Sequence, residues 1–183
     1  MPLSADRRPR EAHSLRRTRY GTTVFRGSAR LMARPMEDYE RLCREKGIGY
    51  LHGTDGITVR GVLPAGEYHV AGDVSSQFCT GLLLALPHTD GNSTLRLQTS
   101  LAGAPYVALT ERTLLSFGYS FAAGYGCYSI PGNQTGAGGL HVTLPADQSS
   151  AAFFGALNVL GGQVKIPQEE GDRLQPDGVW RDL

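Results

Sequence analysis

Two short stretches of this sequence place an aspartate and a pair of serines directly before an apolar run. The first is Gly72-Asp73-Val74-Ser75-Ser76-Gln77, and the second is Asp147-Gln148-Ser149-Ser150-Ala151. Short side chains that carry an oxygen start helices, because they accept hydrogen bonds from the N–H groups of the first turn. Those N–H groups and the positive end of the helix dipole also favour an anion such as phosphate. The repeated pattern predicts two helix starts, and each either caps its own helix or binds an anion.

The composition is that of a globular protein. The chain has 183 residues, of which 40% are hydrophobic and 19% charged, so it is long enough to bury a core. No apolar run reaches the roughly 18 residues of a membrane helix, so we expect a soluble chain without a membrane partner. Three widely spaced cysteines without a C-x-x-C pair argue against a disulfide framework or a zinc site and favour the cytoplasm. We expect neither a metal nor a cofactor.

Positive charge is concentrated at the amino terminus. Residues 1–34 hold nine of the 18 basic residues, against two acidic ones. A basic arm can bind nucleic acid, but this one lacks the interleaved aromatic residues that single-strand binders use. We therefore expect no nucleic-acid partner, and we interpret residues 1–20 as a disordered segment.

Hydrophobic periodicity predicts alternating strands and helices. The predicted strands are 22–27, 57–62, 68–70, 94–98, 119–122, 128–130, 140–144 and 163–166. Helices are predicted over 37–46, from Ser76 to about Pro87, over 107–117, and from the second serine pair to Gly161. A glycine-rich stretch, 132–139, is predicted to be a mobile loop. This order predicts an α+β chain that contains a repeated unit.

Several of these stretches together resemble one enzyme family. The 72–78 stretch, Arg34-Pro35-Met36, Pro105-Tyr106-Val107 and Asp147-x-Ser149-Ser150-Ala151 are similar, in order and approximate spacing, to EPSP synthase (3-phosphoshikimate 1-carboxyvinyltransferase). The resemblance runs from about Val24 to the carboxy terminus. It implies βαβαββ repeat units, each domain being an inverse α/β half-barrel, here incomplete because family members are more than twice as long.

The resemblance also implies a domain organisation and a reaction. Residues 6–20 do not resemble the family, so 1–20 would be a disordered or non-family segment. Residues 21–145 would form a partial shikimate-phosphate-binding domain, and 146–183 would start the second domain of a truncated enzyme. The family transfers the enolpyruvyl group of phosphoenolpyruvate to the 5-hydroxyl of shikimate 3-phosphate in aromatic amino acid (chorismate) biosynthesis. These two small molecules would be the substrates, and we expect a cytoplasmic monomer.

Individual residues take roles from the resemblance. Ser75, Ser76 and Gln77 would hold shikimate 3-phosphate, and Gln77 would also touch phosphoenolpyruvate, which agrees with the anion-binding interpretation of the helix start. Arg34 would grip phosphoenolpyruvate with its guanidinium fork. Tyr106 would pack along the shikimate ring, and Asp177 would contact shikimate 3-phosphate and accept the proton. From the local sequence alone, Arg34 could equally be a surface arginine and Tyr106 a core aromatic residue. Asp177 could be a solvated aspartate in a loop.

Two departures from the family pattern bear on activity. Gly103 stands where the family has a serine that contacts phosphate, and Pro176 replaces a glycine just before Asp177. The family's amino-terminal lysine and its later glutamate, lysine and arginines have no counterpart here. We expect the isolated chain to bind ligand weakly and to show no enolpyruvyl transfer, because cations around two polyanions supply much of the transition-state stabilisation.

Two other functions stay open. The chain could be a non-catalytic sugar-phosphate-binding protein or a structural remnant of the family. It could also resemble the sister enzyme, UDP-N-acetylglucosamine enolpyruvyl transferase, which uses a cysteine in a mobile loop as an acid. Cys43, Cys79 and Cys127 do not lie in such a loop, which favours the shikimate enzyme.

Overall fold

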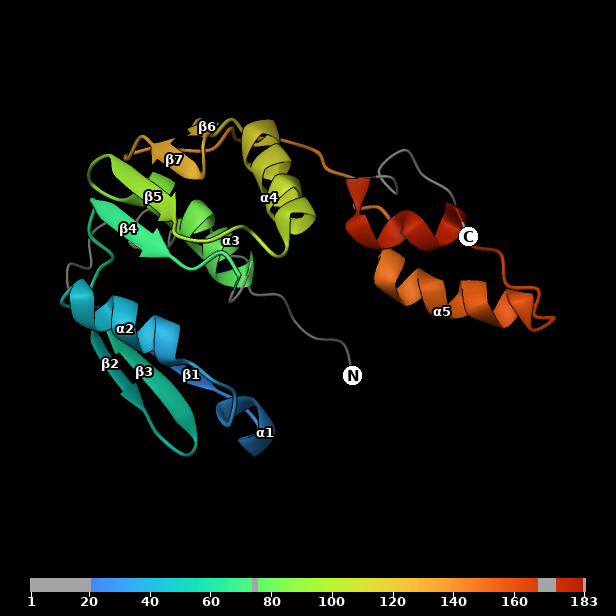
Figure 1. The fold of residues 1–183 in the computed structure, drawn as a ribbon, viewed down its shortest axis with the longest axis horizontal. Helices are drawn as coiled ribbons and strands as arrows, with labels where there is room; N and C mark the ends of the chain where they lie inside the picture. The colour runs from blue at the N-terminus through green and yellow to red at the C-terminus, as the bar shows by residue number, and fades with distance from the viewer. Residues whose placement is uncertain (1–20, 74–75, 168–173, 183) are drawn as a thin grey trace. The chain divides into compact units, whose positions relative to one another are not determined.

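A computed structural model describes residues 21–73, 76–167 and 174–182 (Figure 1). The contacts divide the chain into two compact units, one up to Pro64 and one from Ala65 onward. The first unit contains β1 (Thr22–Arg26), α1 (Ala29–Met32), α2 (Glu37–Glu45), β2 (Gly49–His52) and β3 (Gly56–Arg60). The second contains β4 (Glu67–Val70), α3 (Ser76–Ala85), η1 (Leu86–His88), β5 (Ser93–Leu97), α4 (Ala104–Ser116), β6 (Ala122–Gly124), β7 (Cys127–Ile130), α5 (Gln148–Val159) and η3 (Pro176–Asp182).

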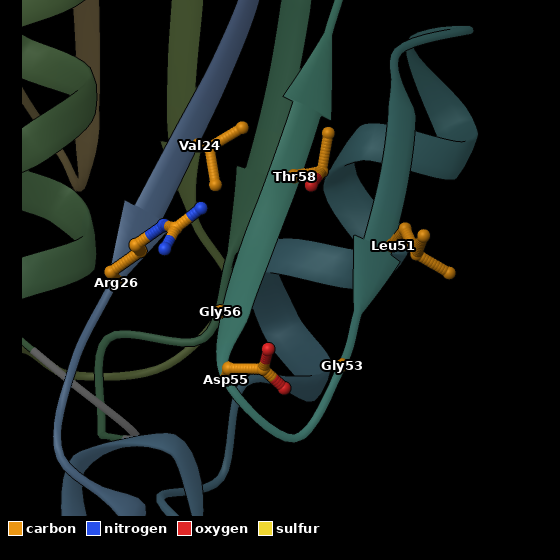
Figure 2. A pocket seen from close by; sticks show the side chains of 7 residues that line it. All are labelled: Val24, Arg26, Leu51, Gly53, Asp55, Gly56 and Thr58. Carbon is orange, nitrogen blue, oxygen red and sulfur yellow. The ribbon is translucent and has the colours of Figure 1, made fainter.

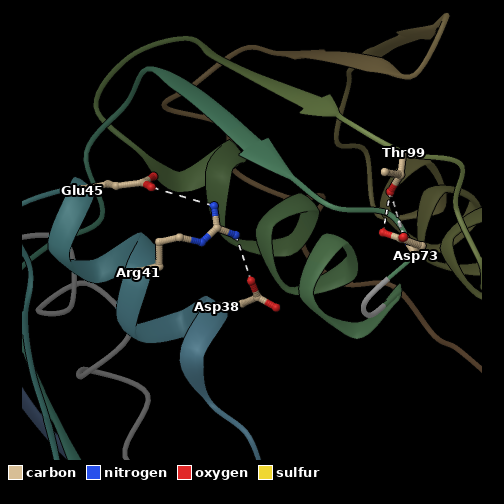
Figure 3. Close-up of polar contacts among 5 residues, drawn as sticks. All are labelled: Asp38, Arg41, Glu45, Asp73 and Thr99. Atoms are coloured by element: carbon tan, nitrogen blue, oxygen red, sulfur yellow. Dashed lines mark hydrogen bonds and ion pairs between the residues drawn. The ribbon is translucent and has the colours of Figure 1, made fainter.

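The first unit is a three-stranded antiparallel sheet with a helix packed beside it. Its strand order is β1-β3-β2, and α2 contacts β2. A small core forms where Met32, Cys43, Ile48 and Ile57 are buried. On the surface of α2, Arg41 pairs with Asp38 at 2.8 Å and with Glu45 at 3.8 Å (Figure 3). Sequence analysis missed α1 and β2, which are four residues each and too short to show a period.

One face of this first sheet is open. Val24, Thr58 and Leu51 form a cross-strand row on it, because Val24 and Leu51 both pair with Thr58 (Figure 2). Val24 is 53% exposed and Leu51 68% exposed. The row lines a shallow pocket of about 190 Å³ together with Arg26 and Asp55, whose side chains flank it.

The second unit is built on a mixed four-stranded sheet. The order is β4-β5-β7-β6; β4 and β5 are parallel, and the other pairs are antiparallel. Parallel pairing requires a crossover, which α3 supplies. Phe78, Cys79, Leu82 and Leu83 form the buried face of α3 at helical spacing, and Leu83 and Cys79 are 1% exposed. This face fixes the position of the helix relative to the strands, because burying one such side chain stabilises the fold by about 1.5–3 kcal/mol.

The structure confirms the α+β class and corrects several local predictions. Segments 140–144 and 163–166 are not strands, and no described strand pairs with them. The predicted mobile loop is wrong for its first residues, because Gly132, Asn133 and Gln134 donate backbone hydrogen bonds to the 87–92 turn. Gly132 permits this approach, since a Cβ there would lie 2.1 Å from the Gly91 carbonyl oxygen. Neither described sheet closes into a barrel.

Two predictions concern features that the described residues test only in part. The described helices include none that is both long and apolar enough to cross a membrane. The predicted domain boundary at residue 145 stays a prediction, as does the interpretation of residues 1–20, which lie outside the described residues.

The three cysteines carry free thiols, and Cys43 and Cys79 are buried.

Candidate functional site

The candidate site lies where the two parallel strands end. β4 leads through Gly72 and Asp73 into α3, and β5 leads through residues 98–103 into α4. The first turns of both helices therefore meet at the carboxyl edge of one strand pair, and α3 packs against α4. Ligands of open α/β sheets bind at this edge, because loops and helix starts converge there.

A buried glycine allows the two loops to meet. The Ala102 N–H donates to the Gly72 carbonyl oxygen at 3.0 Å, so the loop after β5 lies directly against the end of β4. A Cβ at Gly72 would lie 2.7 Å from the Thr99 carbonyl oxygen and 3.0 Å from that of Ser100. Real Cβ atoms do not approach backbone oxygens so closely, so the position requires glycine.

Asp73 bonds across to the other loop. Its N–H donates to Thr99 Oγ1 at 3.1 Å, and Thr99 Oγ1 donates to Asp73 Oδ1 at 2.6 Å (Figure 3). The carboxylate thus fixes the loop after β5. Ser75, the residue just before the first turn of α3, lies outside the described residues, so its predicted role stays a prediction.

A pocket of about 430 Å³ opens between the first turns of α3 and α4. It is lined by Ser76, Gln77, Thr80, Gly81, Tyr106, Leu109 and Thr110. Ser76 is half-buried and Gln77 is exposed, so these side chains face solvent rather than the core. The structure brings together three of the residues singled out in the sequence, Ser76, Gln77 and Tyr106.

Sequence analysis gave no role to two hydroxyls in this pocket, those of Thr80 and Thr110. Thr80 and Thr110 lie on neighbouring helices with their Oγ1 atoms 3.3 Å apart. Each lies four residues after a residue that sequence analysis did select, Ser76 or Tyr106. Because residues four apart share a helix face, that spacing was a signal available in the sequence.

The pocket holds hydroxyls and an amide but no charge. Within the described residues its lining contains no Lys, Arg, Asp or Glu. An anion bound there would rely on hydroxyl and amide donors and on the positive end of the α3 dipole. No group of His, Cys, Asp and Glu in the described part of the chain has the arrangement of a metal site.

Gly103 lies directly against Ser76. A Cβ at Gly103 would lie 2.5 Å from both Cβ and Oγ of Ser76. A serine at position 103, expected from the family pattern, would therefore need Ser76 to move. The departure at Gly103 removes one hydroxyl, and Ser76 occupies part of the space that the missing side chain would take.

A hydrogen bond from Tyr106, which lines the pocket, joins Asp177 to it. The Tyr106 hydroxyl donates to Asp177 Oδ1 at 2.5 Å, and Ser149 Oγ donates to Asp177 Oδ2. The bond from Ser149, and then that from Tyr106, lowers the pKa of Asp177, while the bond to Asp177 raises the pKa of Tyr106. The carboxylate is thus charged at neutral pH and accepts a hydroxyl on each oxygen. Sequence analysis did not foresee that Ser149 bonds to Asp177.

The polar groups at the start of α5 form hydrogen bonds with other residues of the chain. Asp147 is the N-cap of α5 and accepts from the Ser149 N–H at 3.2 Å and from Ser150 Oγ at 2.5 Å. Gln148 is fully buried, where its side chain accepts from Arg181 Nε at 2.9 Å and its carbonyl accepts from the Trp180 indole at 3.1 Å. These bonds attach α5 to η3.

Arg34 lies in the first unit, exposed, just after α1. Ser28 caps α1 by accepting from the Leu31 N–H at 3.3 Å, and the Arg34 N–H donates to the Leu31 carbonyl oxygen at 3.2 Å. Its predicted contact with a ligand stays a prediction, because the pocket belongs to the other unit.

Comparisons with known proteins agree with this fold. The sequence model described as EPSP synthase (3-phosphoshikimate 1-carboxyvinyltransferase) matches residues 12–180. A 3-phosphoshikimate 1-carboxyvinyltransferase of Brachyspira hyodysenteriae is 36% identical over 146 residues, which are 79% of this chain and 34% of the relative. One from Clostridium novyi is 37% identical over 163 residues, 87% of this chain and 37% of the relative.

Solved structures show the same likeness. A structure of EPSP synthase from Acinetobacter baumannii superposes with a TM-score of 0.55 and 27% identity, covering 73% of this chain and 30% of that one. The chain therefore spans about a third of the length of the relatives it matches. The resemblance inferred from the motifs is confirmed, and the chain belongs to the EPSP synthase (3-phosphoshikimate 1-carboxyvinyltransferase) family.

Proposed function

We propose that the chain carries the shikimate-3-phosphate half-site of a 3-phosphoshikimate 1-carboxyvinyltransferase. Such an enzyme transfers the enolpyruvyl group of phosphoenolpyruvate to the 5-hydroxyl of shikimate 3-phosphate, in aromatic amino acid biosynthesis. The observation that carries the proposal is the solvent-open pocket at the carboxyl ends of β4 and β5, where Ser76, Gln77 and Tyr106 meet.

The phosphoryl group would bind at the start of α3. Ser76 and Gln77 offer a hydroxyl and an amide beside the positive end of the helix dipole, and Ser75 is proposed as a further donor. Hydrogen bonds to a charged acceptor contribute about 1.5–3 kcal/mol each, so two or three donors suffice for a weak site. Tyr106 presents a flat ring to the same pocket, on which the six-membered ring of the substrate can lie.

Phosphoenolpyruvate would need additional donors. Arg34 is proposed to bind it with a guanidinium fork, and Gln77 is proposed to contact both substrates. Because the described pocket lining holds no cation, a second polyanion would be repelled by the first unless an arginine or lysine lies between them.

The reaction is an addition followed by an elimination. The 5-hydroxyl loses its proton to a base and its oxygen bonds to C2 of phosphoenolpyruvate, while an acid protonates the methylene carbon. The tetrahedral adduct then expels inorganic phosphate as a proton leaves the methyl carbon, which restores the double bond. Asp177 is proposed as the proton acceptor. Its lowered pKa keeps it ionised but makes it a weak base, so its bonds from Ser149 and Tyr106 must loosen when it takes the proton.

The cysteines support the shikimate enzyme over its sister. Cys43 and Cys79 are buried, and burial raises the pKa of both, that of Cys79 to about 11. The Cys79 thiol lies on the buried face of α3 and does not line the pocket, and the Cys43 thiol is buried in the first unit. Cytoplasmic location, a monomeric state and the absence of a nucleic-acid partner stay predictions.

Calorimetric titration of the 183-residue chain with shikimate 3-phosphate tests the half-site. We expect measurable heat and a Kd that rises about tenfold or more for Ser76→Ala or Gln77→Ala, because each change removes a donor to a charged group. The matched control is Ser150→Ala, since that hydroxyl bonds to Asp147 and lies outside the pocket lining.

Three results would contradict the proposal. The absence of heat in the unsubstituted chain supports the structural remnant instead. Equal weakening by Ser76→Ala and Ser150→Ala means that the pocket is not the binding site. Binding of UDP-N-acetylglucosamine in preference to shikimate 3-phosphate favours the sister enzyme. A coupled phosphate-release assay, in which we expect no steady turnover by this chain alone, separates binding from catalysis.

A further inference from the structure

Two threonines join α3 to α4 inside the pocket. The two helices pack side by side (Figure 1), with Thr80 one turn beyond Ser76 on α3 and Thr110 one turn beyond Tyr106 on α4. The Oγ1 atoms of the threonines are 3.3 Å apart, within hydrogen-bond distance, and both residues are half-buried. Both line the pocket, so this bond crosses from one helix to the other within the candidate site.

The donor and the acceptor in this pair follow from a count of protons. A threonine hydroxyl has one proton to donate and two lone pairs with which to accept. Thr110 Oγ1 donates to the Tyr106 carbonyl oxygen at 3.2 Å, so the proton in the bond between the two threonines is that of Thr80. The result is a chain of two hydrogen bonds that runs from α3 through Thr110 to the backbone of Tyr106.

This assignment separates the threonines from the groups proposed to bind phosphate. An ionised phosphoryl oxygen accepts hydrogen bonds, so it requires donors. The protons of Thr80 and Thr110 are already engaged, whereas Ser76 and Gln77 offer a hydroxyl and an amide at the start of α3. The threonines therefore act on a bound phosphoryl group only through the residues whose positions they fix.

At the first turns, the two helices meet where α4 offers no side chain. Gly103 precedes α4, and a Cβ there would lie 2.5 Å from Ser76 Oγ. Because glycine has no side chain that could bond to Ser76, the polar link between the helices lies one turn further on, at Thr80 and Thr110. The distance between Ser76 and Tyr106 depends on that link, and a binding site requires its groups to be held within about 0.5 Å.

We propose that Thr80 and Thr110 are positioning residues of the pocket. Their hydroxyl pair holds α3 against α4, and it thereby fixes Ser76, at the phosphate end of the pocket, relative to Tyr106, at the ring end. The consequence for substrate binding rests on the proposed function, whereas the link between the helices is a property of the chain without ligand. The experiments therefore include one that uses no substrate.

A double-mutant cycle without ligand tests the link. It compares Thr80→Val, Thr110→Val and the double variant by urea denaturation, because valine has nearly the shape of threonine but no hydroxyl. We expect the double variant to lower the urea midpoint no further than Thr110→Val, since that single change already removes both bonds of the chain. In all three variants, hydrogen exchange at the Tyr106 and Val107 amides is expected to increase, because these amides form the first turn of α4.

Titration with shikimate 3-phosphate tests the consequence for binding, at a temperature where every variant is folded. Thr80→Val is expected to raise the Kd about three- to tenfold, which is the equivalent of losing one hydrogen bond. Thr80→Ser keeps the hydroxyl, so we expect its Kd to stay within about twofold of that of the unsubstituted chain. This rescue separates the loss of the hydroxyl from a change in packing.

The matched control is Thr113→Val. Thr113 lies on the same helix and donates to the Leu109 carbonyl oxygen at 2.8 Å, four residues earlier, as Thr110 donates to Tyr106. It does not line the pocket, so this variant removes a hydroxyl bond of the same kind and leaves the link to α3 intact. We expect its Kd and the exchange at the Tyr106 amide to equal those of the unsubstituted chain.

Several results would overturn the inference. They are midpoint shifts that add in the double variant, unchanged amide exchange in Thr80→Val, and, in a chain that binds the ligand, a Kd that Thr80→Val leaves unchanged or that Thr113→Val raises equally. If the unsubstituted chain gives no heat with shikimate 3-phosphate, the proposed function is contradicted, and the ligand-free cycle and the amide exchange decide the inference by themselves.

Discussion

The two serine-rich helix starts have nearly the same sequence and opposite uses. At α5, Asp147 accepts hydrogen bonds from its own first turn, and Ser149 and Ser150 donate to Asp177 and Asp147. At α3, Asp73 bonds to Thr99 on the neighbouring loop, and Ser76 and Gln77 line an open pocket. The comparison teaches that a D-x-S-S pattern locates a helix start. The residues packed around that start decide whether its N–H and hydroxyl donors are left for a ligand.

The largest effect is expected from removing the glycine that brings the loops together. Gly72→Ala would place a Cβ 2.7 Å from the Thr99 carbonyl oxygen, so the loops must separate. We expect a loss of about 1–3 kcal/mol in the free energy of unfolding, the usual cost of overpacking. Urea denaturation measures it.

A matched alanine substitution provides the control. Gly81 lies within α3, and a Cβ there would meet nothing within 4 Å. Gly81→Ala is expected to stabilise the chain by up to about 1 kcal/mol, because alanine favours helix over glycine. Equal destabilisation by both substitutions would mean that the close approach at Gly72 is not what makes glycine necessary.

The aspartates of the two helix starts should respond differently to truncation. Asp147→Ala removes an N-cap and is expected to cost about 1 kcal/mol of stability and some helical signal in circular dichroism. Asp73→Ala is expected to leave helical signal unchanged and to increase hydrogen exchange at Asp73 and in the 98–103 loop, because its partner is Thr99. A similar loss of helix in both variants would erase the distinction between the two starts.

The smallest expected effect is on the stability of the chain at acid pH. The folded-state pKa of Asp177 is lowered, so its bonds to Ser149 and Tyr106 add stability above the ordinary aspartate pKa of about 3.9. That stability is lost as the pH falls through the lowered pKa. Melting temperatures measured from neutral pH to below about pH 4 should fall less steeply in Asp177→Asn than in the unsubstituted chain. If the melting temperatures of the two chains fall equally steeply with pH, Asp177 does not contribute to the loss of stability in acid.

Much of the site could be predicted from local pattern. The sequence located the start and end of α2, α3, α4 and α5 to within a few residues, because apolar spacing and glycine stops are local signals. Gly47 and Gly118, which directly follow the predicted helices 37–46 and 107–117, have φ of +69° and +79°, a conformation that glycine adopts without strain. The motif order also identified the family.

The remaining features depend on contacts that are distant in the chain. Segments 140–144 and 163–166 alternate like strands, but a strand exists only where another strand pairs with it, and the described residues supply none. The stretch 132–139 was predicted to be mobile because it is rich in glycine, yet backbone N–H groups of its first residues donate to the 87–92 turn, forty or more residues earlier in the chain. Neither outcome is encoded in the segment itself.

The sequence alone determined α2, α3, α4 and α5, the α+β class and the family, since each depends on residue type and spacing within one segment or on the order of several. The tertiary structure decided that Asp73 turns to Thr99, that Ser76 and Tyr106 share a pocket, and that Ser149 bonds to Asp177. The physical reason is that a hydrogen-bond donor of a helix start has several possible acceptors, and only the packing of β4, β5 and their helices selects among them.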